Sequence, residues 1–97
     1  MATYISLIQY TQQGLAAVKE SPKRLDAARK TFEQAGVKIK EFYLVMGKYD
    51  IVIIAEAPND DVALRNALEY GLAGNGRSRT MRAFTSDEAV RVTKQLS

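Results

Sequence analysis

Four segments of the chain carry the hydrophobic pattern of β-strands. Residues 3–10 alternate around Ile5 and Leu7, residues 37–45 place charged positions between apolar ones, residues 50–57 are densely β-branched, and residues 77–85 form a fourth such segment. Strand side chains point to the two faces of a sheet in turn, and β-branched residues fit that pleated surface. The sequence therefore predicts four strands.

Helical spacing recurs between and after these strands. Ser21-Pro22 fits a helix start, because Ser is a good N-cap and Pro suits the first helical position. Asn59 is the expected cap of a second helix, and Thr85 with Glu88 forms a capping box that opens a last one. A short helical stretch is also expected around residues 15–18. The predicted inner faces are Leu25, Ala28, Phe32 and Ala35 in the first long helix, Leu64, Ala67, Leu68, Gly71 and Leu72 in the second, and Ala89, Val92, Thr93 and Leu96 in the last.

The predicted element order is β-α-β-β-α-β, followed by a C-terminal helix. Two successive β-α-β units define the ferredoxin-like plan of an α+β domain, in which a four-stranded antiparallel sheet carries both main helices on one face. A chain of 97 residues fits a single domain over residues 1–97. The second face of the sheet then has no helix of its own.

The turn between the second and third strands decides which side chains share a face. Gly47-Lys48 is typical of a tight hairpin turn. This turn sets Tyr43 opposite Val52, Glu41 opposite Ile54 and Ile39 opposite Glu56. The helix-covered face is expected to hold Phe42, Leu44, Ile51, Ile53 and Ala55, and the bare face Val37, Ile39, Glu41, Tyr43, Val45, Asp50, Val52, Ile54 and Glu56. A three-residue loop would exchange the two faces.

The bare face carries more large apolar side chains than a sheet surface left in water. Burying each of them is worth about 1.5–3 kcal/mol, so covering four would drive a second copy onto the first, face to face. We therefore predict a homodimer, with a higher homo-oligomer left open.

Composition narrows the chemistry. The chain has no Cys and no His, which excludes disulfides, a thiol nucleophile and the commonest metal ligands, so we expect no metal site and no cofactor. With 14 Lys and Arg against 11 Asp and Glu the net charge is +3, too small to argue for nucleic acid. No signal peptide or membrane span is recognised, and we expect a cytoplasmic protein without a membrane partner.

A group of residues around the hairpin resembles a known family. Gly47-Lys48-Tyr49-Asp50, followed by Ile51-Val52 and Glu56-Ala57-Pro58, is similar to the GYD-domain family, named for that Gly, Tyr and Asp. Similar residues extend over most of the chain. They are Thr3-Tyr4-Ile5, Tyr10 to Gly14, Ser21 to Arg24, Tyr43, Gly74-Asn75, Arg77 and Arg82-Ala83-Phe84.

The resemblance implies a ferredoxin-like unit of the dimeric α/β-barrel class, in a family whose function is largely uncharacterised. The chain departs from the family pattern at two positions. The family leads us to expect a β-branched residue at Gly76 and an acidic one at Arg79, which puts any shared ligand at the fourth strand in doubt.

Six residues are candidates for ligand binding: Glu41, Tyr43, Tyr49, Asp50, Glu56 and Arg82. Asp50 beside the Tyr49 phenol can hold a small ligand, or it can accept backbone N–H bonds at the hairpin end while Tyr49 packs with the helices. Glu41 and Glu56 are diagonal neighbours at roughly 7–8 Å, close enough to raise one pKa. The alternative is that each carboxylate pairs with a cation or stays in water. Lys40, Arg79 and Arg82 are the expected cations.

The arginines of the fourth strand separate by alternation. Arg77 and Arg79 fall on one side and Arg82 on the other, so they do not form one phosphate clamp.

Two function classes remain open at this stage. The first is a small homodimer whose sheets enclose a partly apolar cavity for a small organic ligand, or which serves as an assembly module. The alternative is a cofactor-independent isomerase or monooxygenase, for which fold analogy is the only warrant. In that case Asp50 or the Glu41/Glu56 pair would be the base, and Tyr43 or Arg82 would steady an oxyanion. Whether the protein is an enzyme is left open.

Overall fold

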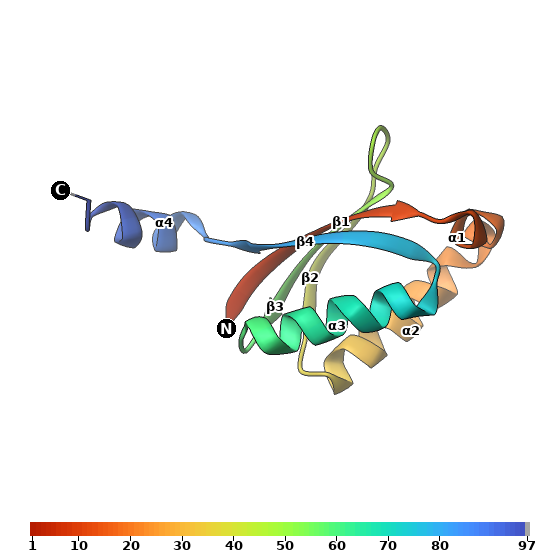
Figure 1. Cartoon of the computed structure of the whole chain (residues 1–97), viewed down its shortest axis with the longest axis horizontal. Helices are drawn as coiled ribbons and strands as arrows, with labels where there is room; N and C mark the ends of the chain where they lie inside the picture. Colours follow the sequence, from red (N-terminus) through yellow and green to blue (C-terminus); the bar gives the residue numbers. More distant parts are fainter. Residues whose placement is uncertain (97) are drawn as a thin grey trace.

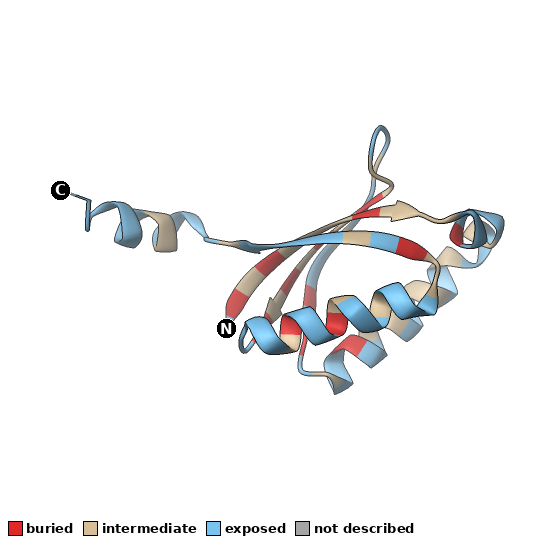
Figure 2. Ribbon diagram, viewed as in Figure 1, coloured by how far each residue is buried: buried red, intermediate tan, exposed pale blue. Residues whose placement is uncertain are grey.

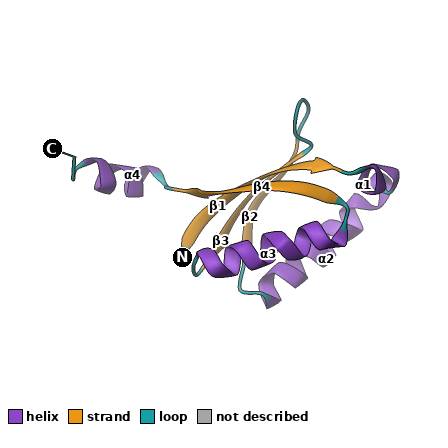
Figure 3. Cartoon of the chain, viewed as in Figure 1, coloured by secondary structure: helices purple, strands orange, loops and turns teal. Residues whose placement is uncertain are grey.

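The computed structural model describes residues 1–96 of the chain. Its elements are β1 (Ala2–Tyr10), α1 (Gln12–Ala16), a 3-10 turn η1 (Val18–Glu20), α2 (Ser21–Gln34), β2 (Lys38–Leu44), β3 (Ile51–Ala57), α3 (Asp60–Ala73), β4 (Gly76–Ala83) and α4 (Ser86–Thr93). Figure 3 shows the strands forming one layer and α2 and α3 a second.

The sheet is antiparallel throughout, with strand order β2-β3-β1-β4. Both α2 and α3 lie on the same face of it (Figure 1). This confirms the predicted α+β, ferredoxin-like topology with an additional C-terminal helix.

The core lies between the sheet and these two helices. Along β1 the even positions Ala2, Tyr4 and Ile8 are buried, and along β3 the odd positions from Ile51 to Ala57 are buried. Phe32 of α2 closes the core from the helix side. The buried and half-buried bands alternate along the strands (Figure 2), as expected for a sheet covered on one face only.

The hairpin between β2 and β3 has the predicted register near its turn. Tyr43 pairs with Val52, and the Val45 N–H donates to the Asp50 carbonyl at 2.8 Å. Gly47 has φ +111°, a conformation that glycine adopts without steric cost. This register places Phe42, Ile51 and Ile53 toward the helices as predicted, whereas Leu44, also expected there, is 64% exposed.

The start of β2 corrects the prediction. A β-bulge between Ile39 and Glu41 sets Ile39 opposite Ala55 and Lys38 opposite Glu56. One extra residue in a strand moves all the preceding side chains to the other face. Val37 and Ile39, expected on the bare face, are therefore in the core, with 4% and 7% of their surfaces exposed.

The first helices also differ from the prediction in detail. The short helical stretch expected at residues 15–18 is α1, which begins earlier because the Thr11 side chain caps it by accepting from the Gly14 N–H. Ser21 is the first residue of α2, and its side chain makes no capping bond to the helix backbone.

The inner face of α3 was predicted wrongly at its three leucines, although Ala67, also expected inward, is half-buried. Leu64, Leu68 and Leu72 were expected inward, but 61%, 61% and 86% of their surfaces are exposed. The helix instead turns Ala63 and Asn66 to the sheet, with Tyr70 beside them. The core side of α3 therefore carries small or polar side chains, and its leucines face outward.

α4 extends away from the body of the molecule, beyond the end of the sheet (Figure 1). The predicted capping box is present, with Thr85 and Glu88 each accepting the other's backbone N–H. Two residues of the expected inner face are uncovered: Val92 of α4 is 47% exposed, and Leu96, which lies beyond the end of α4, is 74% exposed. The helix is therefore defined locally by its cap and not by packing.

The capping box predicts an acid-sensitive α4. The Thr85 backbone N–H, with the Thr85 hydroxyl, lowers the pKa of the Glu88 carboxyl below its ordinary 4.5. A lowered folded-state pKa stabilises the cap above the ordinary pKa, and that stability is lost as the pH falls through the folded value. NMR titration of Glu88 should give a midpoint below 4.5, and Thr85→Ala should raise it. An unchanged midpoint in the variant would contradict the capping role.

Candidate functional site

The face of the sheet that carries no helix is the first candidate site, and we name it the open face. Its apolar side chains come from all four strands: Ile5 and Leu7 of β1, Tyr43 of β2, Val52 and Ile54 of β3, and Met81 of β4. Ile5 pairs with Ile54 on one side and with Met81 on the other, so these side chains form one continuous surface. Tyr43 and Met81 at its margins are 50% and 46% exposed.

Three of the six predicted site residues lie on the open face. The Tyr43 hydroxyl donates to Oε2 of Glu41 at 3.5 Å. Glu56 lies two residues along β3 from Ile54, the partner of Glu41, so the two carboxylates occupy the expected diagonal positions. Oε1 of Glu56 lies 3.7 Å from Nζ of Lys40, one of the cations expected to pair with it. The structure thus provides the Glu56 carboxylate with a cationic partner.

Asp50 acts in the pairing of β3 with β1. Its backbone N–H donates to the Ile8 carbonyl at 2.8 Å, and Oδ2 accepts from the Tyr10 N–H at 2.8 Å. These bonds extend the ladder beyond the end of β3. The structural alternative stated for Asp50, an acceptor of backbone N–H bonds at the hairpin end, is therefore present.

Tyr49 lies in the hairpin loop, which projects away from α2 and α3 (Figure 1). The Lys48 ammonium is 5.8 Å from the centre of the Tyr49 ring. The Lys48 carbonyl accepts from the Gln9 side chain at 2.7 Å, which joins the loop to β1. The expectation that Tyr49 packs with the helices is therefore not met.

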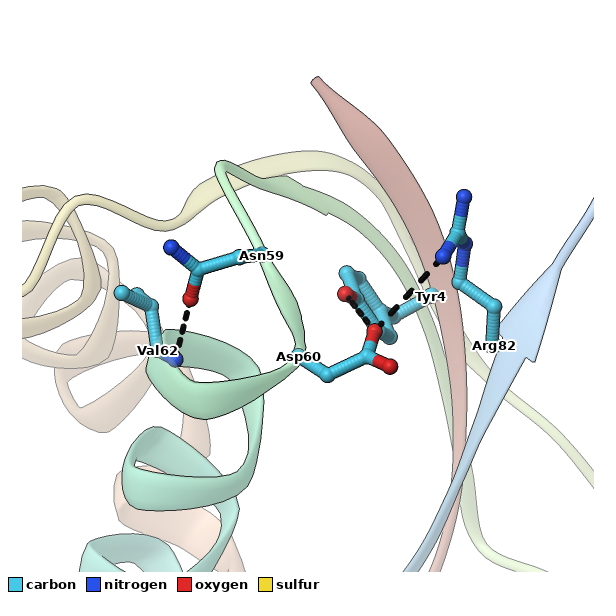
Figure 4. Close-up of polar contacts among 5 residues, drawn as sticks. All are labelled: Tyr4, Asn59, Asp60, Val62 and Arg82. Carbon is cyan, nitrogen blue, oxygen red and sulfur yellow. Dashed lines mark hydrogen bonds and ion pairs between the residues drawn. The ribbon is translucent and has the colours of Figure 1, made fainter.

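Arg82 lies on the helix-covered face of β4, opposite to Arg77 and Arg79 as alternation predicts. Figure 4 shows its guanidinium directed at Asp60, with Nη1 3.6 Å from Oδ1. The Tyr4 hydroxyl donates to the same oxygen at 2.5 Å. The guanidinium also lies 5.9 Å from the Tyr4 ring centre and 5.0 Å from that of Phe84. Arg82 thus forms a cluster with Tyr4, Asp60 and Phe84. It lies on the opposite face of the sheet from Glu41 and Tyr43.

The electrostatics of this cluster keep Tyr4 protonated. Burial raises the pKa of the Tyr4 phenol, and its hydrogen bond to the Asp60 carboxylate raises it further. Asp60 also begins α3, directly after the Asn59 side chain that accepts the Val62 N–H at 3.0 Å (Figure 4). Sequence analysis missed the Tyr4–Asp60 bond, because an Asp in the first turn of a helix is already explained by the helix dipole.

Metal ligation and membrane insertion find no support among the described residues. Among residues 1–96, no group of three or more His, Cys, Asp or Glu side chains is placed to hold a metal ion. None of the helices over those residues is long and apolar enough to cross a membrane.

The topology defines the protein as a ferredoxin-like α+β domain, and one face of its sheet carries no helix. The GYD domain family model matches residues 4–92, and the chain belongs to the GYD-domain family. The residues that give the family its name, Gly47, Tyr49 and Asp50, form the β2–β3 loop described above.

A curated protein from Thermus thermophilus is similar to this chain. The two are 29% identical over 85 residues, which cover 87% of this chain and 90% of the relative. That relative is described as a glutamine synthetase and cystathionine beta-lyase binding protein. No solved structure matches the chain.

Proposed function

We propose that this protein is a non-catalytic binding module, which associates with a second copy through the open face and binds other proteins through its helix layer. The continuous apolar surface of the open face is the observation that carries the proposal. Covering it with an identical surface removes apolar area from water on both copies, at about 25 cal/mol per Å². In a dimer with a two-fold axis, the same patch of each copy packs against its equivalent, so one self-complementary patch is sufficient.

The direction in which α4 follows β4 favours a second copy of the chain as the occupant of the open face. The connection from β4 to α4 is only two residues long, and the capping box and the Arg82–Phe84 contact hold it. α4 thereby extends beyond its own sheet (Figure 1). A copy seated on the open face extends the apolar contact to α4.

The outer side of α3 is the proposed surface for other proteins. Leu64, Leu68 and Leu72 recur every four residues, so they form one stripe along the exposed side of the helix. Such a stripe packs against an apolar helix or groove of another protein. The similarity to a relative whose description names two enzymes that it binds supports protein binding.

The small-ligand chamber between two sheets is a finer proposal that depends on the dimer. In it, Glu41, Tyr43 and Glu56 would supply polar groups at the margin of the interface, and Tyr49 and Asp50 would lie at one end. The catalytic alternative receives less support. Asp50 already accepts a backbone bond, and Arg82 lies on the other face of the sheet from Glu41.

The partner surface is tested with two purified proteins, glutamine synthetase and cystathionine beta-lyase from the same source as this chain. Biolayer interferometry should detect binding of wild type to at least one of them. Leu68→Lys should weaken that binding at least about tenfold, because it places a charge in the middle of the stripe. Leu15→Lys, the same change at a 59% exposed leucine of α1, is the matched control and should bind as wild type does.

Three results would count against the proposal. Absence of binding to both enzymes would reject these partners. Equal loss in the two variants would reject the stripe as the binding surface. A wild-type protein that sediments as a monomer at micromolar concentration would reject self-association.

A further inference from the structure

We propose that the cavity enclosed by α2, α3 and the helix-covered face of the sheet binds a small organic carboxylate with an apolar body. The cavity has a volume of about 270 Å³. Small-molecule sites usually measure about 300–1,000 Å³, so the ligand is at the small end of that class. This site lies on the opposite side of the sheet from the open face, and it does not depend on the proposed function.

The walls of the cavity are apolar over most of their area. Phe32 of α2 forms one side, and Ile39, Phe42, Ile51 and Ile53 of the sheet form the floor. Side chains of this kind hold a hydrocarbon or aromatic group by exclusion of water. The cavity exists because α3 turns small residues to the sheet and its leucines outward, so no large apolar side chain from α3 fills the space.

Asn66 adds an amide to the lining of the cavity. Its surface is only 8% exposed, and its side chain lines the cavity. An amide in this position offers two donors and one acceptor to a molecule in the cavity.

The polar end of the cavity supplies a cation and hydroxyl groups. Nη2 of Arg24 donates to the Gly14 carbonyl at 3.3 Å and to Oγ of Ser21 at 3.4 Å. The Tyr10 hydroxyl lies 3.5 Å from the same Ser21 oxygen. A guanidinium has five N–H donors, and these two long bonds leave most of them for a carboxylate.

Tyr70 and Glu69 complete the charge balance at the cavity. Burial raises the pKa of the Tyr70 phenol, so the hydroxyl is a neutral donor at pH 7. Glu69, the acidic residue of the lining, has its own cation, with Oε1 3.7 Å from Nε of Arg65. The group that remains to be neutralised is therefore Arg24, which favours an anionic ligand.

Gly76 makes room for the Tyr70 hydroxyl. A Cβ at position 76 would lie 2.8 Å from that hydroxyl and 2.9 Å from Cγ2 of Ile8. The β-branched residue that the family resemblance leads us to expect here would displace Tyr70. The absence of a side chain at Gly76 is therefore part of the site.

The test uses phenylacetate, with uncharged 2-phenylethanol as its matched control. Titration into ¹⁵N-labelled protein should shift the amide signals of residues 24–32 and 66–75, and 2-phenylethanol should bind at least about tenfold more weakly because it lacks the charge-assisted bonds. Arg24→Gln should weaken phenylacetate binding by a similar factor. Lys23→Gln removes a neighbouring charge outside the cavity lining and should change affinity less than twofold.

A filling variant keeps the proposal testable if Arg24→Gln disturbs α2. Ala28→Phe places a ring in the cavity and should abolish the phenylacetate shifts while the far-ultraviolet circular dichroism stays that of wild type. Three outcomes would overturn the proposal: no shifts with wild type, equal affinity for 2-phenylethanol, or unchanged binding by folded Ala28→Phe.

Discussion

Ile54→Lys is expected to convert the proposed dimer to a folded monomer. Ile54 lies in the middle of the open face, between Ile5 on one side and Glu41 on the other. In the monomer the new ammonium stays in water beside the Glu41 carboxylate, an opposite-charge cross-strand pair that favours the sheet. In the dimer two such charges would be buried, at a cost of several kcal/mol each.

The change should weaken self-association at least about 100-fold, equivalent to about 2.7 kcal/mol. Sedimentation velocity over a concentration series measures it, and the thermal midpoint reports whether the fold survives. Leu64→Lys, which puts the same side chain on exposed α3, is the matched control and should remain a dimer. An Ile54→Lys protein that is still dimeric would show that the open face is not the interface.

Gly14→Ala should give the largest loss of stability of any single methyl added to this chain. A Cβ at position 14 would lie 1.9 Å from the Asn75 carbonyl oxygen, which is backbone and cannot rotate away. That oxygen accepts from the Thr11 N–H, and the Thr11 hydroxyl donates to the Gly74 carbonyl, so the clash would separate α1 from the α3–β4 turn. Overpacking of this kind costs about 1–3 kcal/mol or more.

A loss of about 3 kcal/mol lowers the thermal midpoint of a domain this size by roughly 12–24 °C. Calorimetry at a fixed protein concentration measures the change. Gly71→Ala is the matched control, because nothing lies within 4 Å of its added methyl and its backbone is helical. In a helix Ala is favoured over Gly by about 0.5–1 kcal/mol, so the control should be stabilised. Equal midpoints for the two variants would contradict the close contact at Gly14.

The element order and the register near the hairpin could be predicted from sequence because each depends on local signals. The run from Ile51 to Ile54, the Gly47 turn and the Thr85–Glu88 box each act within a few residues, and the structure has all three. The bulge at Lys40 has no such signal. The bulge depends on the pairing of β2 with β3. Because of it, Val37 and Ile39 lie in the core and not on the expected bare face.

The orientation of α3 shows a second limit of sequence patterns. Two stripes run along this helix, one of leucines and one that includes Ala63, Asn66 and Tyr70. Hydrophobicity favours the leucine stripe for the core, but the structure turns the stripe of Ala63, Asn66 and Tyr70 toward the sheet. That choice is made by tertiary packing, and the cavity beside Asn66 follows from it. No pattern of the sequence alone could have located that cavity.

The six predicted site residues divide in the same way. Glu41, Tyr43 and Glu56 share a face because strand alternation after the bulge is regular. Arg82 lies apart from them because β4 places it toward α3, where Asp60 is its partner. Alternation along β4 was itself predicted correctly, but no local signal connected Arg82 with Asp60 or Tyr4.

The outward leucines of α3 have a consequence for stoichiometry. A two-fold dimer displays two copies of the stripe, so each assembly is bivalent. A monomeric partner would occupy both copies independently and form a closed 2:2 complex. A partner with several equivalent grooves would instead be cross-linked by the dimers. With the dimer in large excess each partner would be saturated and stay soluble, whereas comparable amounts of the two proteins would form an extended network.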